Sequence, residues 1–190
     1  AARYDLKTLL SESANLPRSY FRGLNFLLNE QPDQAIDAFI EVVKLDPETI
    51  ELHFALGNLF RRRGETDRAI RIHQNLLSRV DLPANERDHA LFELGQDFLK
   101  AGLLDRAEET LAHLESGEHA LGAQRALLTI YEIEKEWTKA IKIAEKLESM
   151  GASPLGKEIA QFHCELAQEA LARNEPRAAA DELALALKAN

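Results

Sequence analysis

Apolar residues recur every three or four positions along most of the chain, as in "AIDAFIEVV", "ALFELGQDFL" and "AIKIAEKL". This spacing puts the apolar side chains on one face of a helix and predicts amphipathic α-helices. Sustained alternation of apolar and polar residues, which is typical of half-buried strands, does not occur. The pattern therefore predicts an all-α fold.

The predicted helices contain an internal repeat. The segments "DQAIDAF", "DRAIRIH", "DRAEETL", "TKAIKIA" and "RAAADEL" align on Ala35, Ala69, Ala107, Ala140 and Ala179, which are 34, 38, 33 and 39 residues apart. A glycine stands twelve residues before each of the first three alanines, and an aromatic residue follows each glycine by three positions: Gly23 with Phe26, Gly57 with Phe60, and Gly95 with Phe98. This pattern resembles the tetratricopeptide repeat, a unit of two antiparallel helices, and predicts a right-handed superhelical solenoid.

Small residues at the glycine and alanine positions let the two helices of a pair approach closely, and the aromatic residue fills the space above them. The aromatic residues Phe26, Phe60, Phe98 and Tyr131 are therefore expected in the core. Gly64 and Gly102 each lie five residues before a repeat alanine, where the first helix must end. Glycine adopts the left-handed conformation of such a helix end without a steric penalty, so both are expected to have positive φ. Asp67 and Asp105 follow, near the positive end of the second helix.

The frame predicts about five helix pairs, at residues 17–48, 49–82, 85–117, 119–151 and 156–190, after a leader at residues 1–16 that can form a short helix. The fourth pair has Leu128 at the small position, and the fifth has Ala170 at the aromatic position, so looser packing is expected there. The final helix keeps an apolar stripe, "AADELALALKA", where a solenoid normally ends in a polar cap. We expect the array to be truncated at this end.

The chain is acidic, with 23 Lys and Arg against 32 Asp and Glu and a net charge of −9. This balance argues against nucleic acid as a partner. It does not by itself explain Arg61, Arg62 and Arg63, which are expected in the last turn of a helix. Cations in that turn complement the helix dipole, which is one explanation, and a local anion-binding surface is the other.

In repeats of this type, certain positions of the first helix face a concave groove. They predict a partner-binding surface at Phe54, Asn58, Arg61, Arg62, Phe92, Gln96, Lys100 and Arg125, with Glu51, His89, Leu99, Thr129 and Glu132 at further lining positions. Amides can pair with a peptide backbone and arginine forks with carboxylates, so an acidic peptide suits this lining. The alternative is a solvated wall in which Phe54 and Phe92 pack against neighbouring helices.

No enzymatic chemistry is predicted. The six histidines show no metal-ligand spacing on a shared helix face, and the single cysteine, Cys164, excludes an internal disulfide and a paired-cysteine zinc site. The adjacent pair His163 and Cys164 is the one candidate for covalent chemistry, and a packing role is favoured for it. No cofactor or metal is expected in this chain, and no apolar stretch is long enough to span a membrane.

The resemblance extends beyond the repeat. The segments "RGLNFLLNEQPDQAIDAFIEVVKLDP", "ELHFALGNLFRRRGETDRAIRIHQNLL" and "EIAQFHCELAQEAL" resemble the lipopolysaccharide assembly protein B family of Gram-negative bacteria, over nearly the whole chain. The resemblance implies a regulator on the cytoplasmic face of the inner membrane, with an N-terminal membrane helix, a repeat array and a C-terminal domain in which cysteines hold a metal. This sequence contains neither the membrane helix nor the metal domain. We therefore expect the chain to be the N-terminal half of the repeat region, with residues 1–16 beside the membrane.

The resemblance also implies an adaptor function. The family promotes proteolysis of the deacetylase that commits precursors to lipid A, by the membrane-bound ATP-dependent zinc protease, and both proteins, with other lipopolysaccharide assembly proteins, are the expected partners. Two alternatives stay open. The chain could be a self-assembly module that sets the geometry of a homo-oligomer through exposed Leu183, Leu185 and Leu187, or a generic peptide-binding scaffold.

Overall fold

The computed structural model describes residues 49–189, together with Arg22, Asn25, Phe26, Gln34, Ile36, Asp37, Ala38, Ile40 and Glu41. The expected leader at 1–16 lies outside the described residues, as does most of the expected first helix pair at 17–48. The described residues contain helices and no strand, so the predicted all-α class is confirmed. None of the described helices is long and apolar enough to cross a membrane.

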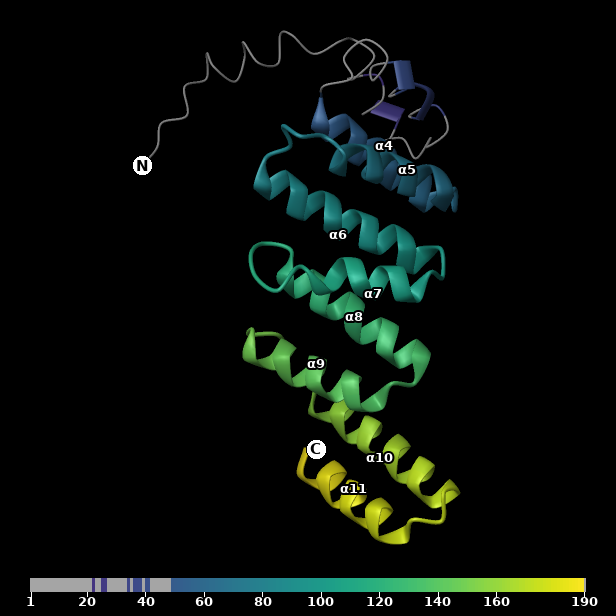
Figure 1. The fold of residues 1–190 in the computed structure, drawn as a ribbon, viewed down its shortest axis with the longest axis vertical. Helices are drawn as coiled ribbons and strands as arrows, with labels where there is room; N and C mark the ends of the chain where they lie inside the picture. The colour runs from purple at the N-terminus through teal and green to yellow at the C-terminus, as the bar shows by residue number, and fades with distance from the viewer. Residues whose placement is uncertain are drawn as a thin grey trace, which may run out of the picture. The chain divides into compact units, whose positions relative to one another are not determined.

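The chain divides into two compact units, Ala1–Asp81 and Leu82–Asn190. The first contains the helix pair α4 (Ile50–Arg62) and α5 (Thr66–Leu77). The second contains the pairs α6 (Ala84–Lys100) with α7 (Leu104–Ala112), α8 (Ala120–Glu134) with α9 (Trp137–Ser149), and α10 (Gly156–Ala172) with α11 (Pro176–Ala189). In the second unit α7 packs on α8 and α9 packs on α10, so successive pairs form layers (Figure 1).

The pairs α4–α5 and α6–α7 are each held by the close approach of their two helices at the repeat glycine. A Cβ placed on Gly57 of α4 would overlap the imidazole ring of His73 on α5. A Cβ on Gly95 of α6 would lie 2.6 Å from Cγ of Leu111 on α7. Because real Cβ contacts are longer than this, neither position accepts a larger residue without moving the helices apart.

The turn inside each described pair has the same geometry. In all four, a residue one or two positions after the end of the first helix has a positive φ: Gly64 (80°), Gly102 (74°), Lys135 (59°) and Asn174 (62°). The next N–H donates to the carbonyl five residues earlier, as from Glu65 to Phe60 at 2.9 Å and from Glu136 to Tyr131 at 2.9 Å. This is the Schellman ending of a helix. The expectation for Gly64 and Gly102 is confirmed. The pairs α8–α9 and α10–α11 form the same turn without glycine.

The repeat aromatic residues are core residues. Phe60 and Phe98 are each 2% exposed and Tyr131 is 8% exposed, which confirms their predicted burial, while Phe26 is only partly buried and packs against the core of the first unit. A cation from the second helix of the pair covers each of the three buried rings: Arg68 over Phe60 at 3.9 Å, Arg106 over Phe98 at 4.1 Å, and Lys139 over Tyr131 at 5.0 Å from the ring centroid. In the last pair Ala170 and Ala178 hold the two equivalent positions, so α10 and α11 lack this contact.

Replacing Gly95 by alanine tests the close approach. The new methyl group would collide with the fully buried Leu111, so we expect Gly95→Ala to lower the free energy of unfolding by about 1–3 kcal/mol, as overpacking does in other cores. Urea denaturation followed by circular dichroism measures the change.

Leu111→Ala supplies the control for this substitution. It removes the side chain that the new methyl group would meet, so Gly95→Ala should cost less in the Leu111→Ala background than in the wild type. An equal cost in both backgrounds would show that the collision is not the cause.

Candidate protein-binding surfaces

In the first unit, the predicted surface residues lie at the end of α4. Arg61 and Arg62 are in its last turn, where their charges complement the carbonyl end of the helix. Arg61 donates from Nη2 to Oδ1 of Asn58 at 2.6 Å, one turn earlier on the same helix. Arg62 is exposed and forms no hydrogen bond or ion pair with a described residue. The structure therefore fixes one guanidinium of this pair and leaves the other open to a partner.

Arg63, the third arginine of the run, has a structural role. It is the C-cap residue of α4, and its Nε lies 3.0 Å from Oε1 of Glu65 in the turn. Helix-end chemistry therefore accounts for Arg63.

Phe54 lies in the core of the first unit. It is 6% exposed, and its ring tilts against that of His73 with centroids 6.0 Å apart. A partner could reach little of this side chain, so we leave Phe54 out of the surface proposed below.

In the second unit, Phe92 belongs to a stack of three rings. The ring of His119, at the N-cap of α8, lies 4.8 Å from that of His89 and 5.2 Å from that of Phe92, both on α6. A Cβ on Gly122 would lie 3.0 Å from the edge of Phe92, so glycine at this position of α8 lets the ring approach the helix closely. His89 also places Nε2 at 3.4 Å from Oε1 of Glu93.

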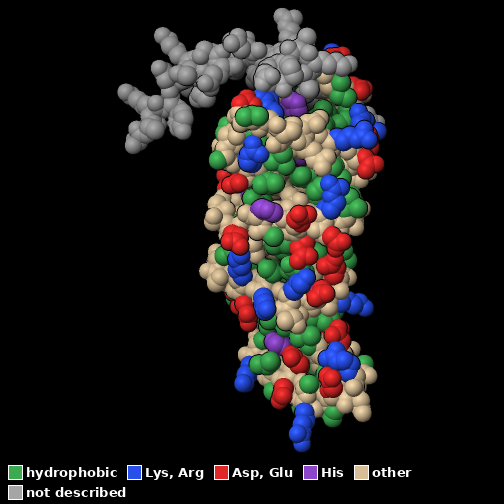
Figure 2. Space-filling model, viewed as in Figure 1, with side chains coloured by type: hydrophobic (Ala, Val, Ile, Leu, Met, Phe, Trp, Pro, Cys, Tyr) green, Lys and Arg blue, Asp and Glu red, His purple; other side chains and the backbone are tan. Residues whose placement is uncertain are grey.

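The remaining predicted residues lie on α6 and α8, which pack against each other. Gln96 is half-buried on α6, while Lys100 and Arg125 are exposed, one on each helix. Neither cation forms an ion pair with a described residue. On the face drawn in Figure 2, acidic and basic side chains alternate, and no broad patch of one charge is visible. Recognition by these cations would therefore be local.

Several polar residues of this region were not predicted from the sequence. Glu93, Asp97 and Gln124 are 8%, 0% and 1% exposed, and the side-chain oxygen of Gln124 has no hydrogen-bond partner in the described part of the chain. His119 was not grouped with Phe92 because it lies in the connection between two pairs. The spacing of His89 and Glu93 by four residues on one helix was a signal that could have indicated a contact.

Two carboxylates face each other farther along this unit. Glu132 is on α8 and Glu158 is in the first turn of α10. Partial loss of hydration raises the pKa of Glu132, and the negative charge of Glu158 raises it further. The ionised form of Glu132 is therefore less favourable in the folded chain than in the unfolded chain.

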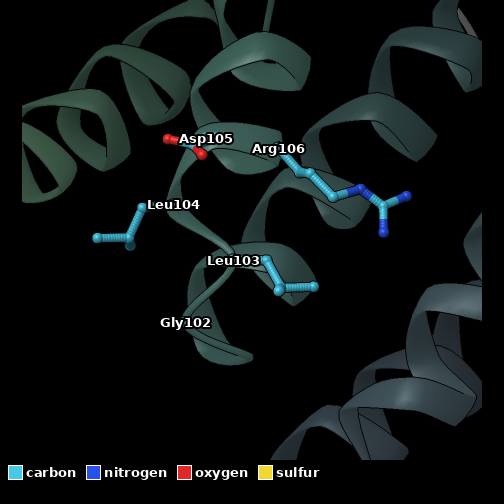
Figure 3. A pocket seen from close by; sticks show the side chains of 5 residues that line it. All are labelled: Gly102, Leu103, Leu104, Asp105 and Arg106. Atoms are coloured by element: carbon cyan, nitrogen blue, oxygen red, sulfur yellow. The ribbon is translucent and has the colours of Figure 1, made fainter.

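The pocket at the turn between α6 and α7 offers little for binding or catalysis. It has a volume of about 380 Å³, and Leu103 and Arg106 point to one side and Leu104 to the other (Figure 3). Asp105 and Arg106 bring opposite charges to it, and no buried polar group lines it.

The pair His163 and Cys164 is part of the α10–α11 packing. Nδ1 of His163 lies 2.7 Å from Oε2 of Glu182 on α11, so the imidazole bridges the two helices. Among the described residues, no group of three His, Cys, Asp or Glu side chains could hold a metal ion.

Comparison with known proteins places this geometry in context. A tetratricopeptide repeat family model matches residues 52–87. The chain is 46% identical over 165 residues to Lipopolysaccharide assembly protein B of Escherichia coli K12, covering 86% of this chain and 42% of that protein. It is 39% identical over 186 residues to the protein of the same name from Haemophilus influenzae, covering 93% of this chain and 46% of that protein.

Solved structures agree on the fold. A crystal structure of MamA is 21% identical with a TM-score of 0.62, covering 88% of this chain and 93% of that chain. A structure of pilF from Pseudomonas aeruginosa is 14% identical with a TM-score of 0.61, covering 86% of this chain and 71% of that chain. At these identities the likeness shows the fold alone, and it confirms the predicted tetratricopeptide-repeat solenoid.

The sequence comparison also confirms the predicted resemblance to lipopolysaccharide assembly protein B. The chain spans less than half the length of these curated relatives.

Glu132→Gln tests the facing carboxylates. Partial loss of hydration and the negative charge of Glu158 both disfavour the ionised form of Glu132 in the folded chain, so Glu132→Gln should raise the free energy of unfolding at pH 7, by less than about 1 kcal/mol for such an exposed group. Because the folded-state pKa of Glu132 is raised, wild-type stability recovers as the pH falls through that value. The gain from Glu132→Gln should therefore disappear at acidic pH, where the wild-type carboxyl is protonated.

Thermal denaturation at pH 7 and at pH values below the ordinary range of glutamate measures both effects. Glu145→Gln, at an exposed position of α9, controls for the loss of a negative charge from an acidic chain. A gain that persists unchanged at acidic pH would contradict the assignment.

Proposed function

Because the chain is a relative of lipopolysaccharide assembly protein B, we propose that it is a non-enzymatic, protein-binding adaptor in lipopolysaccharide assembly. It acts at the cytoplasmic face of the bacterial inner membrane. It promotes proteolysis of the deacetylase that commits precursors to lipid A, by the membrane-bound ATP-dependent zinc protease. The level of that deacetylase would in turn set the output of lipopolysaccharide.

The observation that carries this proposal is the open cationic end of α4. Arg61 is held by Asn58, and Arg62 is exposed without a partner among the described residues. A guanidinium binds a carboxylate through two parallel N–H donors, which gives geometric selectivity as well as affinity. This end of α4 therefore suits an acidic segment of a partner protein.

The second unit offers a surface of similar chemistry. Lys100 and Arg125 are exposed cations without ion pairs to described residues, and half-buried Phe92 and Gln96 lie on α6. The ring stack of Phe92 with His119 holds a flat apolar surface in place, at a low entropic cost for a partner that packs on it. We assign protein binding to this surface also.

A second candidate function is self-assembly through α11. Four residues after the repeat alanine, Leu111 and Ala144 are fully buried in the two preceding pairs, whereas Leu183 is 45% exposed. Leu187 is 84% exposed, and a pocket of about 410 Å³ lies between it and Cys164 of α10. A second copy of the chain could cover this apolar face.

Charge reversal at the end of α4 tests the adaptor function. We expect Arg61→Glu with Arg62→Glu to weaken binding to the purified deacetylase, or to the cytoplasmic part of the protease, by about tenfold, since two attractive charges become repulsive. Helical content by circular dichroism should not change, because both side chains point away from the core.

A matched control reverses two exposed cations elsewhere, with Lys142→Glu on α9 and Lys157→Glu on α10. The control should bind as the wild type does. Equal losses in both variants would indicate a general charge effect, and unchanged binding in the α4 variant would remove this surface from the proposal.

Leu187→Glu tests self-assembly. The side chain is 84% exposed, so the substitution should leave the fold intact. If α11 mediates association, light scattering should detect an oligomer for the wild type and a monomer for Leu187→Glu. A wild type that is monomeric at all concentrations would reject this function and leave the adaptor function in place.

A further inference from the structure

A pocket of about 320 Å³ lies on the first unit, apart from the proposed surface at the end of α4. It is lined by four apolar side chains and two arginines: Ile40, Leu56, Phe60, Ile72, Arg68 and Arg71. An apolar pocket with a few polar groups at its edge is the usual form of a binding site.

The apolar lining is accessible at its rim. Leu56 and Phe60 are 5% and 2% exposed and form the floor, within the core cluster of this unit. Ile40 and Ile72 are partly buried and pack at the edge of the same cluster. A ligand side chain could therefore remove apolar surface from water here without displacing a core residue.

The two arginines differ in their contacts. Arg68 is fixed, because its guanidinium lies over the ring of Phe60 and its Nη1 is 2.7 Å from Oε2 of Glu65. Arg71 is exposed, one helical turn farther along α5, and forms no hydrogen bond or ion pair with a described residue. The pocket thus joins an apolar wall to one guanidinium that is free to bind an anion.

The later pair α8–α9 contains the corresponding aromatic ring and cation, and a carboxylate contacts both of them. Tyr131 and Lys139 hold the positions of Phe60 and Arg68 in the repeat. There the carboxylate of Glu108, from the preceding α7, accepts a hydrogen bond from the Tyr131 hydroxyl at 2.7 Å and lies 3.5 Å from Nζ of Lys139. A carboxylate therefore fits against this arrangement of ring and cation.

The first repeat does not supply such a carboxylate at that position. Glu108 stands one residue after the repeat alanine Ala107, and the equivalent residue after Ala35 is Ile36. Ile36 is apolar and 3% exposed. The pocket on the first unit therefore has cations and an apolar wall, and the position equivalent to Glu108 is an isoleucine in the core.

We propose that this pocket is a second docking site, for a segment of a partner protein in which an acidic side chain stands next to a bulky apolar one. The carboxylate pairs with the guanidinium of Arg71, and the apolar side chain packs between Ile40 and Ile72. The local charge agrees with this ligand. Residues 49–81 contain six arginines and four acidic residues, in a chain with a net charge of −9.

The test uses two short peptides with blocked ends, DLFDV and its neutral analogue NLFNV, titrated into the whole chain labelled with ¹⁵N. We expect DLFDV to shift amide signals of the residues around Ile72 and Arg71. The neutral analogue and the variant Arg71→Glu should each weaken binding by about tenfold, the effect of losing one charge-assisted pair. Arg71→Gln, which removes the charge but keeps a polar side chain, should weaken binding without introducing repulsion.

Lys142→Glu on α9 is the matched control, since Lys142 is also exposed, stands two residues after its repeat alanine as Arg71 does, and does not line the pocket. It should change the affinity by less than about threefold, because separated surface charges are screened by salt. Equal losses for Lys142→Glu and Arg71→Glu would overturn the proposal, as would signal changes confined to other residues or no binding of DLFDV at millimolar concentration. The result is independent of the proposed adaptor function, because these peptides and variants do not involve the deacetylase or the protease.

Discussion

The close approach of two helices at a small residue is the constraint on which the described structure depends. Glycine at positions 57 and 95 leaves room for a side chain of the opposing helix, and the repeat alanines at 69, 107 and 140 are fully buried where the pairs meet. Dispersion forces fall off steeply with separation, so a larger residue would weaken the packing of the whole pair. In three of the described pairs, a buried aromatic ring and its covering cation add to this packing.

This constraint leaves the chemistry of the surface free to vary between repeats. The interior positions of each pair are small, aliphatic or aromatic, whereas the exposed positions of the first helices carry arginine, lysine, glutamate and glutamine. The aromatic–cation contact illustrates the difference. Three described pairs share this contact. In α8–α9 the carboxylate of Glu108 lies beside the cation, whereas in α4–α5 an apolar pocket adjoins the ring. One packing rule can thus present different ligand preferences along an array of repeats.

The fold could be predicted because its signals are local. The period of apolar residues indicated helices, and the recurring glycine, aromatic residue and alanine identified the repeat and the buried rings. The candidate surface was predicted less completely. Counting positions from the repeat glycine placed Arg62, Lys100 and Arg125 on exposed faces, but it also selected Phe54, which is buried against His73. A repeat frame predicts which face of a helix a residue occupies, and it does not predict how far a neighbouring side chain covers that face.

The sequence by itself determined the all-α class, the tetratricopeptide repeat, the burial of Phe60, Phe98 and Tyr131, and the family resemblance, because each follows from spacing along one chain. Only the tertiary structure decided which polar groups meet. The stack of His89, His119 and Phe92, the pair of His163 with Glu182, and the place of Arg71 beside Ile40 each depend on contacts with residues distant in sequence. Such contacts are set by the packing of one helix on another, which has no signature in the spacing of either helix alone.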